Sequence, residues 1–252
     1  MTNGTRTYST GTGTGAGTRT FADARRWALI GAELTFEAVA GLDDAGYAEP
    51  SALPGWTRAH VAAHVAANAE ALSHLVHWAA TGEPTPMYAS PEERAAGIER
   101  GRALPAAQLT AWLRRSADAL EAGMDELTDG QWRHEVVTAQ GRTVPATELP
   151  WMRSREVCVH AVDLATGVSF ADLPGDFLIA LCDDVVAKRA AAPGPAVTLR
   201  AAAIGAGWEL PGDGEPVLVT GELSDITAYL TGRDVDLRAA DGSPAPALGA
   251  WL

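Results

Sequence analysis

The sequence has 252 residues, of which 47% are hydrophobic and 20% are charged, so it can form one large domain or two small ones with a buried core. Its formal net charge of −13 argues against nucleic acid and anionic membranes as partners, because both are bound by clustered Lys and Arg. Two cysteines without a CxxC spacing provide no disulfide framework, and neither a membrane-spanning run nor a signal peptide is apparent, which together indicate a protein of the reducing cytoplasm.

The first part of the chain is predicted to be helical. Residues 1–20 are rich in Thr and Gly and cannot contribute to a core, so we expect a disordered tail. Four long helices are then predicted from apolar residues at helical spacing, from capping residues and from the glycines that follow. They cover residues 21 to about 42, 57 to 80, 104 to 127 and 147 to 166, with a short helix at 91–100 and an extended, hairpin-like segment at 132–144. This pattern predicts a four-helix bundle over residues 21–167.

After Gly167 the pattern changes to short runs of alternating residues, punctuated by Pro and Gly. Helices are expected at 176–191 and 223–230, and strands at 196–200, 207–210, 216–220 and 234–238. Residues 168–252 are therefore predicted to form a small α+β domain, which makes the whole chain a two-domain α+β protein.

The fourth long helix carries three ionisable residues on one face. Glu156, His160 and Asp163 are spaced i, i+4 and i+7. Such groups are costly to bury without partners, and a divalent cation is a suitable partner because carboxylate and imidazole are both zinc ligands. The same stripe would also arise if this face of the helix were exposed to solvent, so the helix alone does not decide between the two interpretations.

The second long helix favours the metal site. It carries His60 and His64 at i, i+4, and one of them together with Glu156 and His160 would give two imidazoles and one carboxylate. Three protein ligands leave a position open for water or substrate, which is the pattern of catalytic zinc. Asp163 would then act outside the ligand set, by holding a ligating histidine or contacting bound water. The alternative is a histidine that is simply buried in the core.

Two segments around these residues resemble the mycothiol-dependent maleylpyruvate isomerase family, part of the DinB-like metal-binding four-helix-bundle superfamily. They are residues 53–72, LPGWTRAHVAAHVAANAEAL, and residues 155–164, REVCVHAVDL. A weaker likeness lies at residues 225–233, DITAYLTGR. The resemblance implies zinc held by His64, Glu156 and His160, and a functional Arg233 that reaches the site from the C-terminal domain. An arginine at the end of a helix can also serve only to interact with the helix dipole.

By resemblance, the protein uses zinc and mycothiol to isomerise a maleylpyruvate-like enoyl carboxylate from cis to trans by reversible addition of the thiol. If the thiol is not expelled, the same chemistry gives a mycothiol S-transferase. A third possibility, a non-catalytic metal-stabilised binding module, requires a fourth protein ligand, which His60 or Asp163 could supply. The expected partners are a small-molecule thiol and a small electrophilic carboxylate, with no nucleic acid and no membrane. The chain shows no heptad repeat, so we take a monomer as the simplest expectation.

Overall fold

The computed structural model of the protein describes residues 19–249 and Trp251. The disordered tail expected at residues 1–20 therefore lies almost entirely outside the described residues. Only its last two residues are placed, and Thr20 caps the first helix by accepting a hydrogen bond from the Asp23 backbone N–H at 3.1 Å.

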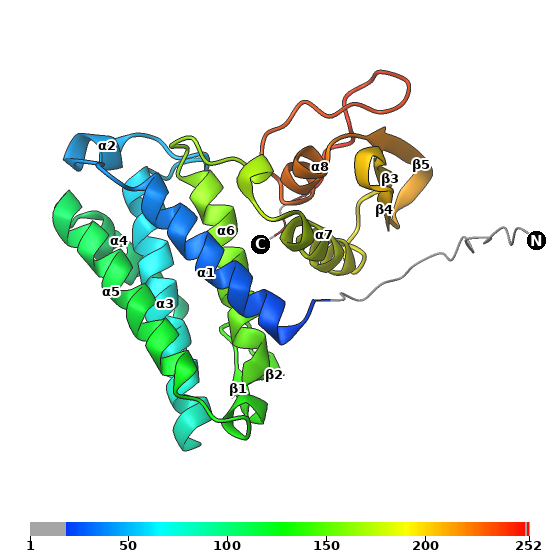
Figure 1. Cartoon of the computed structure of the whole chain (residues 1–252). Helices are drawn as coiled ribbons and strands as arrows, with labels where there is room; N and C mark the ends of the chain where they lie inside the picture. The colour runs from blue at the N-terminus through cyan, green and yellow to red at the C-terminus, as the bar shows by residue number, and fades with distance from the viewer. Residues whose placement is uncertain (1–18, 250, 252) are drawn as a thin grey trace, which may run out of the picture.

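Four long helices form the bundle: α1 (Phe21–Ala38), α3 (Arg58–Thr81), α5 (Ala106–Asp125) and α6 (Leu149–Asp163). α1 lies along α6, and α3 lies between α5 and α6 (Figure 1). α3 is the central helix, since its apolar residues from Val61 to Ala66 are buried on every side. Two shorter helices, α2 (Asp44–Ala48) and α4 (Pro91–Arg102), and a hairpin of β1 (Glu135–Val137) and β2 (Thr143–Pro145) complete this part.

α1 and α6 approach each other closely because Gly31 lies at their contact. A Cβ atom added at Gly31 would come within 2.5 Å of Val157 Cγ2 and 2.6 Å of Cys158 Sγ. Only glycine therefore allows this approach. The close packing holds α6, and the ionisable residues on its other side, in a fixed position relative to the bundle.

The C-terminal part contains α7 (Gly175–Arg189), β3 (Pro195–Ala201), β4 (Ala206–Leu210), β5 (Asp213–Thr220) and α8 (Leu223–Leu230). The strand order is β4-β3-β5, with β4 antiparallel and β5 parallel to β3. α7 contacts β4 and α8, and α8 also packs on β3. Short 3₁₀ helices lie at Gln131–Arg133, Ala146–Glu148, Phe170–Asp172 and Ala202–Ile204. The α+β fold predicted from the sequence is thus confirmed.

One hydrophobic cluster runs through both parts of the chain. The Trp27 ring lies 5.7 Å from that of Phe177 on α7, and the Trp27 indole N–H donates to Asp176 at 3.0 Å. Arg155 of α6 forms an ion pair with Asp184 of α7 at 2.8 Å. These contacts fasten α7 to α1 and α6 (Figure 1).

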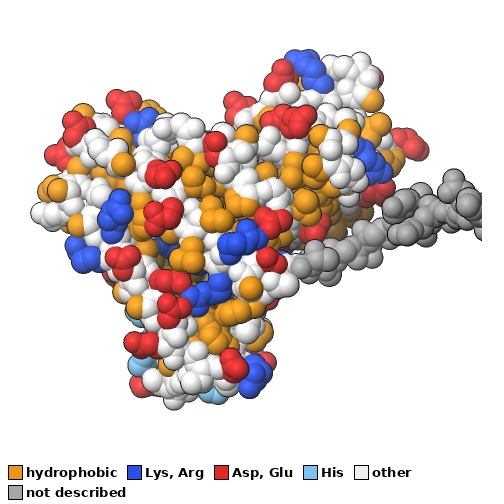
Figure 2. Space-filling model, in the orientation of Figure 1, with side chains coloured by type: hydrophobic (Ala, Val, Ile, Leu, Met, Phe, Trp, Pro, Cys, Tyr) orange, Lys and Arg blue, Asp and Glu red, His pale blue; other side chains and the backbone are white. Residues whose placement is uncertain are grey.

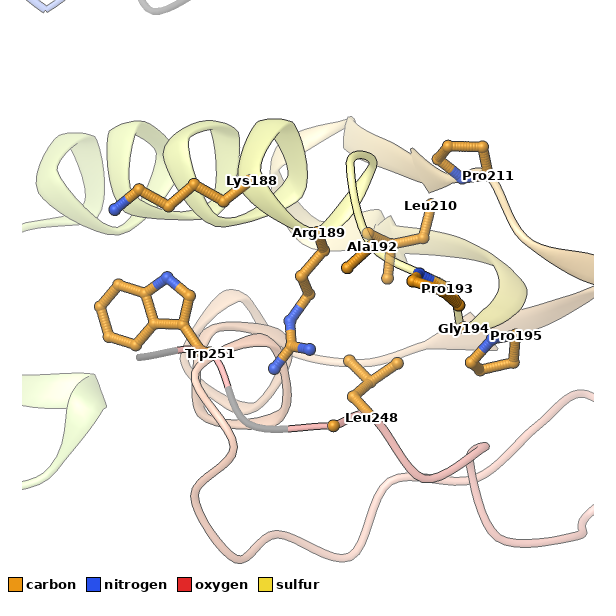
Figure 3. Close-up of a pocket in the computed structure, with 11 residues that line it drawn as sticks. Lys188, Arg189, Ala192, Pro193, Gly194, Pro195, Leu210, Pro211, Leu248 and Trp251 are labelled. Carbon is orange, nitrogen blue, oxygen red and sulfur yellow. The ribbon is translucent and has the colours of Figure 1, made fainter. Parts of the chain in front are cut away.

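A cavity of about 150 Å³ lies at the end of α7, beside the sheet and the C-terminal segment. Arg189 points from α7 toward the C-terminal segment, and the Trp251 ring lies beside Lys188 (Figure 3). Arg189 Nε donates to the Leu230 carbonyl at 3.0 Å, and Lys188 Nζ lies 5.6 Å from the Trp251 ring centre. The cavity marks where the C-terminal segment returns to α7.

Three details differ from the sequence prediction. The first helix ends at Ala38 rather than near residue 42, and the short helix α2 follows, which was not predicted. The fourth long helix ends at Asp163, because Ala165 adopts a φ of 53°. The strand predicted at 234–238 was wrong: the Leu237 N–H donates to the Val235 carbonyl, so the backbone turns there instead of extending along β5.

On the face shown in Figure 2, acidic and basic side chains are interspersed rather than gathered by sign. Among the helices of the described part of the chain, none is long and apolar enough to cross a membrane.

Candidate metal centre

His64, Glu156 and His160 meet where α3 faces α6. The Nε2 atom of His64 lies 2.9 Å from Oε2 of Glu156, and Nε2 of His160 lies 3.4 Å from the same oxygen. One ligand atom from each of the three residues lies within 4.8 Å of the others. Two facing helices therefore present two imidazoles and a carboxylate at one point.

This donor set fits a divalent metal ion. Zn²⁺ binds imidazole nitrogen and carboxylate oxygen at roughly 2.0–2.2 Å, so tetrahedral ligand atoms lie roughly 3.4 Å apart. The two separations from Glu156, 2.9 Å and 3.4 Å, are close to that value, and small side-chain movements would complete the geometry. His64 is 6% exposed, whereas the Glu156 side chain is 25% exposed, so the centre opens to solvent on the carboxylate side.

Behind His160 lies a second set of contacts, outside the three candidate ligands. Nδ1 of His160 lies 2.8 Å from Oδ2 of Asp163, whose side chain is fully buried. The Asp163 carboxylate in turn accepts two hydrogen bonds from Arg233, from Nε at 3.0 Å and from Nη2 at 2.6 Å. Since Nδ1 of His160 is bonded to a carboxylate, its Nε2 is directed at Glu156, as in histidines that ligate metals.

Arg233, which the resemblance implies is functional, lies just beyond the end of α8 and contacts Asp163. Besides its two bonds to Asp163, Nη1 of Arg233 donates to the Thr231 carbonyl at 2.6 Å. Three of its five N–H groups are thus used within the protein, and two remain. The structure places Arg233 behind Asp163 and His160, while direct contact of Arg233 with a substrate stays a prediction.

The charges of the cluster support one another. Burial alone would raise the pKa of Glu156, but hydrogen bonds with His160 and His64 hold that pKa well below its usual value. Burial alone would lower the pKa of His160, but hydrogen bonds to Asp163 and Glu156 raise it to about 9. Burial lowers the pKa of His64. At neutral pH the cluster therefore combines two carboxylates, one neutral imidazole and one imidazolium.

The raised pKa of His160 predicts that zinc binds more tightly as the pH increases. Below about pH 9 this imidazole carries a proton, which must leave before the metal can bind. We expect the apparent affinity to rise by up to about tenfold for each pH unit between about pH 7 and 9, because one proton is exchanged for one ion. Competition with a chromophoric chelator across this range measures the effect, and an affinity independent of pH would contradict it.

Two arginines that the sequence analysis missed flank the cluster. Arg153 is buried, and its Nη1 donates to the Val65 carbonyl and to Asn68 Oδ1, both at 2.9 Å. Burial lowers its pKa to about 10, while the charge of Glu156 opposes that shift. Arg153 lies three residues before Glu156 and Asn68 four residues after His64, so helical spacing could have indicated both.

The second missed arginine, Arg94 of α4, lies on the other side of His64. Its Nη2 is 3.4 Å from Nδ1 of His64, and its guanidinium carbon is 5.9 Å from the centre of the Tyr88 ring. No pattern in the sequence indicated Arg94 or Tyr88, because α4 and the segment before it are separated from both metal-ligand motifs. Only the packing of α4 on α3 brings Arg94 to the site.

The structure separates the remaining histidines and cysteines from the cluster. His60 Nδ1 accepts a hydrogen bond from the Thr57 backbone N–H at 3.0 Å, at the start of α3. His74 and His77 are exposed further along α3. Cys158 and Cys182 are free and buried, and burial raises the pKa of both thiols, that of Cys182 to about 12. Neither thiol has the environment of a nucleophile.

Helical bundles that bind metals build the site from side chains on facing helices. With two imidazoles and one carboxylate brought together between α3 and α6, this protein has the ligand set of that class. Comparison with known proteins gives the family. The sequence profile described as the mycothiol maleylpyruvate isomerase N-terminal domain matches residues 27–165, more than half of the chain. The chain therefore belongs to the mycothiol-dependent maleylpyruvate isomerase family, an enzyme family, which confirms the resemblance seen in the sequence.

Solved structures extend the similarity over nearly the whole chain. The crystal structure of the mycothiol-dependent maleylpyruvate isomerase is similar with a TM-score of 0.86 and 37% identity, covering 91% of this chain and 97% of that one. A mutant of that isomerase with one histidine replaced by alanine is similar with the same TM-score and coverage and 36% identity. No curated protein matches the chain.

Proposed function

We propose that the protein is a zinc- and mycothiol-dependent cis–trans isomerase of a maleylpyruvate-like enoyl carboxylate. The observation that supports this most is the convergence of His64, Glu156 and His160 in a chain that shares its fold with the mycothiol-dependent maleylpyruvate isomerase. When bound, the metal would favour the thiolate form of the cofactor at neutral pH, and reversible addition of that thiolate would convert the double bond of the substrate into a single bond that can rotate.

The surroundings of the three ligands support a catalytic rather than a closed metal site. A closed site needs a fourth protein ligand, and His60 and Asp163 were the two candidates. His60 is bonded to Thr57, and Asp163 is bonded to Arg233 and to the far nitrogen of His160. Neither side chain adds a fourth ligand atom to those of His64, Glu156 and His160, so a fourth coordination position would be left for a reactant. This counts against the non-catalytic binding module.

The residues of the site would have different roles in this reaction. His64, Glu156 and His160 hold the metal, while Asp163 and Arg233 fix the orientation of His160. Arg94 forms no ion pair with an acidic residue in the described part of the chain, and its guanidinium lies beside His64. It can therefore receive a substrate carboxylate through two parallel hydrogen bonds. The S-transferase alternative uses the same residues and differs only in the fate of the thiol.

The test follows the substrate and the thiol together. Purified protein loaded with zinc is incubated with mycothiol and maleylpyruvate, and both the product isomer and the free thiol are measured. We expect the trans product to form while the thiol concentration stays constant. Stoichiometric loss of thiol into an adduct would instead identify a transferase. No reaction in zinc-containing protein would reject both activities toward maleylpyruvate.

A further inference from the structure

Arg153 is buried between the two helices that carry the candidate metal ligands. It lies on α6, one turn before Glu156, and is only 4% exposed. Its Nη1 donates to the Val65 carbonyl and to Asn68 Oδ1 on α3, both at 2.9 Å. Val65 directly follows His64, and Asn68 lies one turn beyond it. The guanidinium of Arg153 is therefore held within about one helical turn of a ligand on each helix.

The positive charge of Arg153 has no carboxylate partner in the described part of the chain. Both of its hydrogen bonds end on neutral oxygens, one of the backbone and one of an amide. Burial lowers its pKa to about 10, so the guanidinium still carries its charge at neutral pH. The negative charge of Glu156 opposes that shift, but a metal bound by Glu156 would take up this charge. With the metal in place, the charge of Arg153 would be left unbalanced.

The other charged groups of the centre do not remove this imbalance. The Asp163 carboxylate is bonded to Arg233 at 2.6 Å, so these two charges balance each other. Arg94, on α4, forms no ion pair with an acidic residue among residues 19–249. Of the carboxylates described at the centre, Glu156 is then left to balance a divalent ion together with Arg94 and Arg153. The metal-loaded centre would carry an excess of positive charge.

A purely structural role does not account for this arrangement. Burying a charge without a partner of opposite sign is unfavourable, and a positive charge beside a cation site weakens binding of the cation. A neutral amide could join α3 to α6 through the same two oxygens. An anion bound at the centre would instead be attracted by the charge of Arg153, and burial limits the screening of that attraction by salt. The arrangement therefore favours an anionic ligand beside the metal.

We propose that Arg153 holds a buried positive charge beside the metal centre that makes the fourth coordination position selective for anionic ligands, such as a thiolate, over neutral ones. Arg153 acts through its charge and not by contact with the metal. The proposal rests on the function proposed above, because a thiolate is the anion that this function brings to the metal.

Cobalt(II) in place of zinc allows the proposal to be tested without turnover, because its visible absorption changes when a ligand enters its coordination sphere. Azide serves as the small anion, and imidazole, at a pH where it is uncharged, as the neutral ligand. We expect Arg153→Met to raise the Kd for azide at least about tenfold, which corresponds to about 1.4 kcal/mol, and to leave the Kd for imidazole unchanged. The variant is expected to fold, since an apolar side chain can often replace a buried charge of similar volume.

Two further variants separate the charge of Arg153 from its packing. Asn68→Asp places a carboxylate on the guanidinium while keeping the link between α3 and α6, so we expect it to weaken azide binding as Arg153→Met does. Arg153→Lys keeps the charge and should bind azide nearly as wild type does. A packing role predicts the reverse, with azide binding kept in Asn68→Asp and reduced in Arg153→Lys, and that result would overturn the proposal.

Arg155→Met is the matched control, because Arg155 lies on the same helix but its charge is paired with Asp184 of α7 at 2.8 Å. Its Kd for azide should equal that of the wild type. Equal azide binding by Arg153→Met and Arg155→Met would contradict the proposal, as would an equal loss of azide and imidazole. Wild-type protein that binds cobalt and azide but does not react with mycothiol would reject the proposed reaction alone. Wild-type protein that binds no cobalt would reject both.

Discussion

Replacing Glu156, His64 or His160 by alanine is expected to remove the bound zinc. The Glu156 carboxylate lies between the two imidazoles, 2.9 Å and 3.4 Å from their Nε2 atoms, so each replacement takes away one of three converging ligands. If a binding free energy on the order of 10 kcal/mol is shared among three ligands, each loss costs roughly 3 kcal/mol, a factor of more than 100 in affinity. Zinc measured by mass spectrometry after loading and desalting should fall from about one equivalent to near zero.

His60→Ala provides the control for this experiment. His60 lies one helical turn before His64 on α3, but it is bonded to Thr57 at the start of the helix. Its replacement should leave the zinc content unchanged and cost only some helix stability. Full zinc content in all three ligand variants would show that the cluster is not the metal site.

Arg233→Ala is expected to lower both stability and activity while zinc still binds at saturating concentration. The variant leaves the fully buried Asp163 carboxylate with His160 as its charged partner. Removing one partner of a buried pair costs up to about 3–5 kcal/mol. His160 would also be held less firmly, and losing such supporting contacts typically weakens metal binding or activity by about 10–100-fold. Thermal unfolding, zinc titration and kcat measure the three effects.

Two further variants make this prediction specific. Arg238→Ala removes an exposed arginine nearby in the sequence, which pairs with the exposed Asp236 and donates to the Gly242 carbonyl at 3.4 Å, so it should change little. Arg233→Lys keeps the charge but loses the two parallel hydrogen bonds to Asp163, so it should restore only part of the function. Similar behaviour of Arg233→Ala and Arg238→Ala would exclude a role for Arg233 in the site.

Most of the fold could be predicted because its elements are specified locally. The four long helices, the hairpin and three strands of the C-terminal sheet follow from periodicity and from residues such as Thr57 and Gly82, which cap the ends of α3. The errors lie where contacts between distant parts of the chain determine the local backbone structure. The segment 234–238 has the composition of a strand, but it is anchored at the metal centre by Arg233 and then turns, so it cannot run along β5.

The candidate metal site could also be predicted in part from the sequence. His64, Glu156 and His160 were chosen from helical spacing and family resemblance, and the structure brings them together, although their binding of a metal stays a prediction. The position of Asp163 beside His160 follows from its spacing on α6. Arg94 could not be predicted, since its proximity to His64 depends on how α4 packs on α3.

The hydrophobic cluster shared by both parts of the chain has a consequence for folding. Trp27, Trp151 and Phe177 join α1, α6 and α7 in one aromatic group, so neither part can lose its packing without exposing apolar surface of the other. Although the architecture changes near Gly167, we therefore expect the parts before and after it to unfold together, in one cooperative transition. The helical bundle expressed without the C-terminal part would lose Arg233 and expose Trp27. A C-terminal part taken from a related protein would have to supply both the arginine and an aromatic surface that fits Trp27.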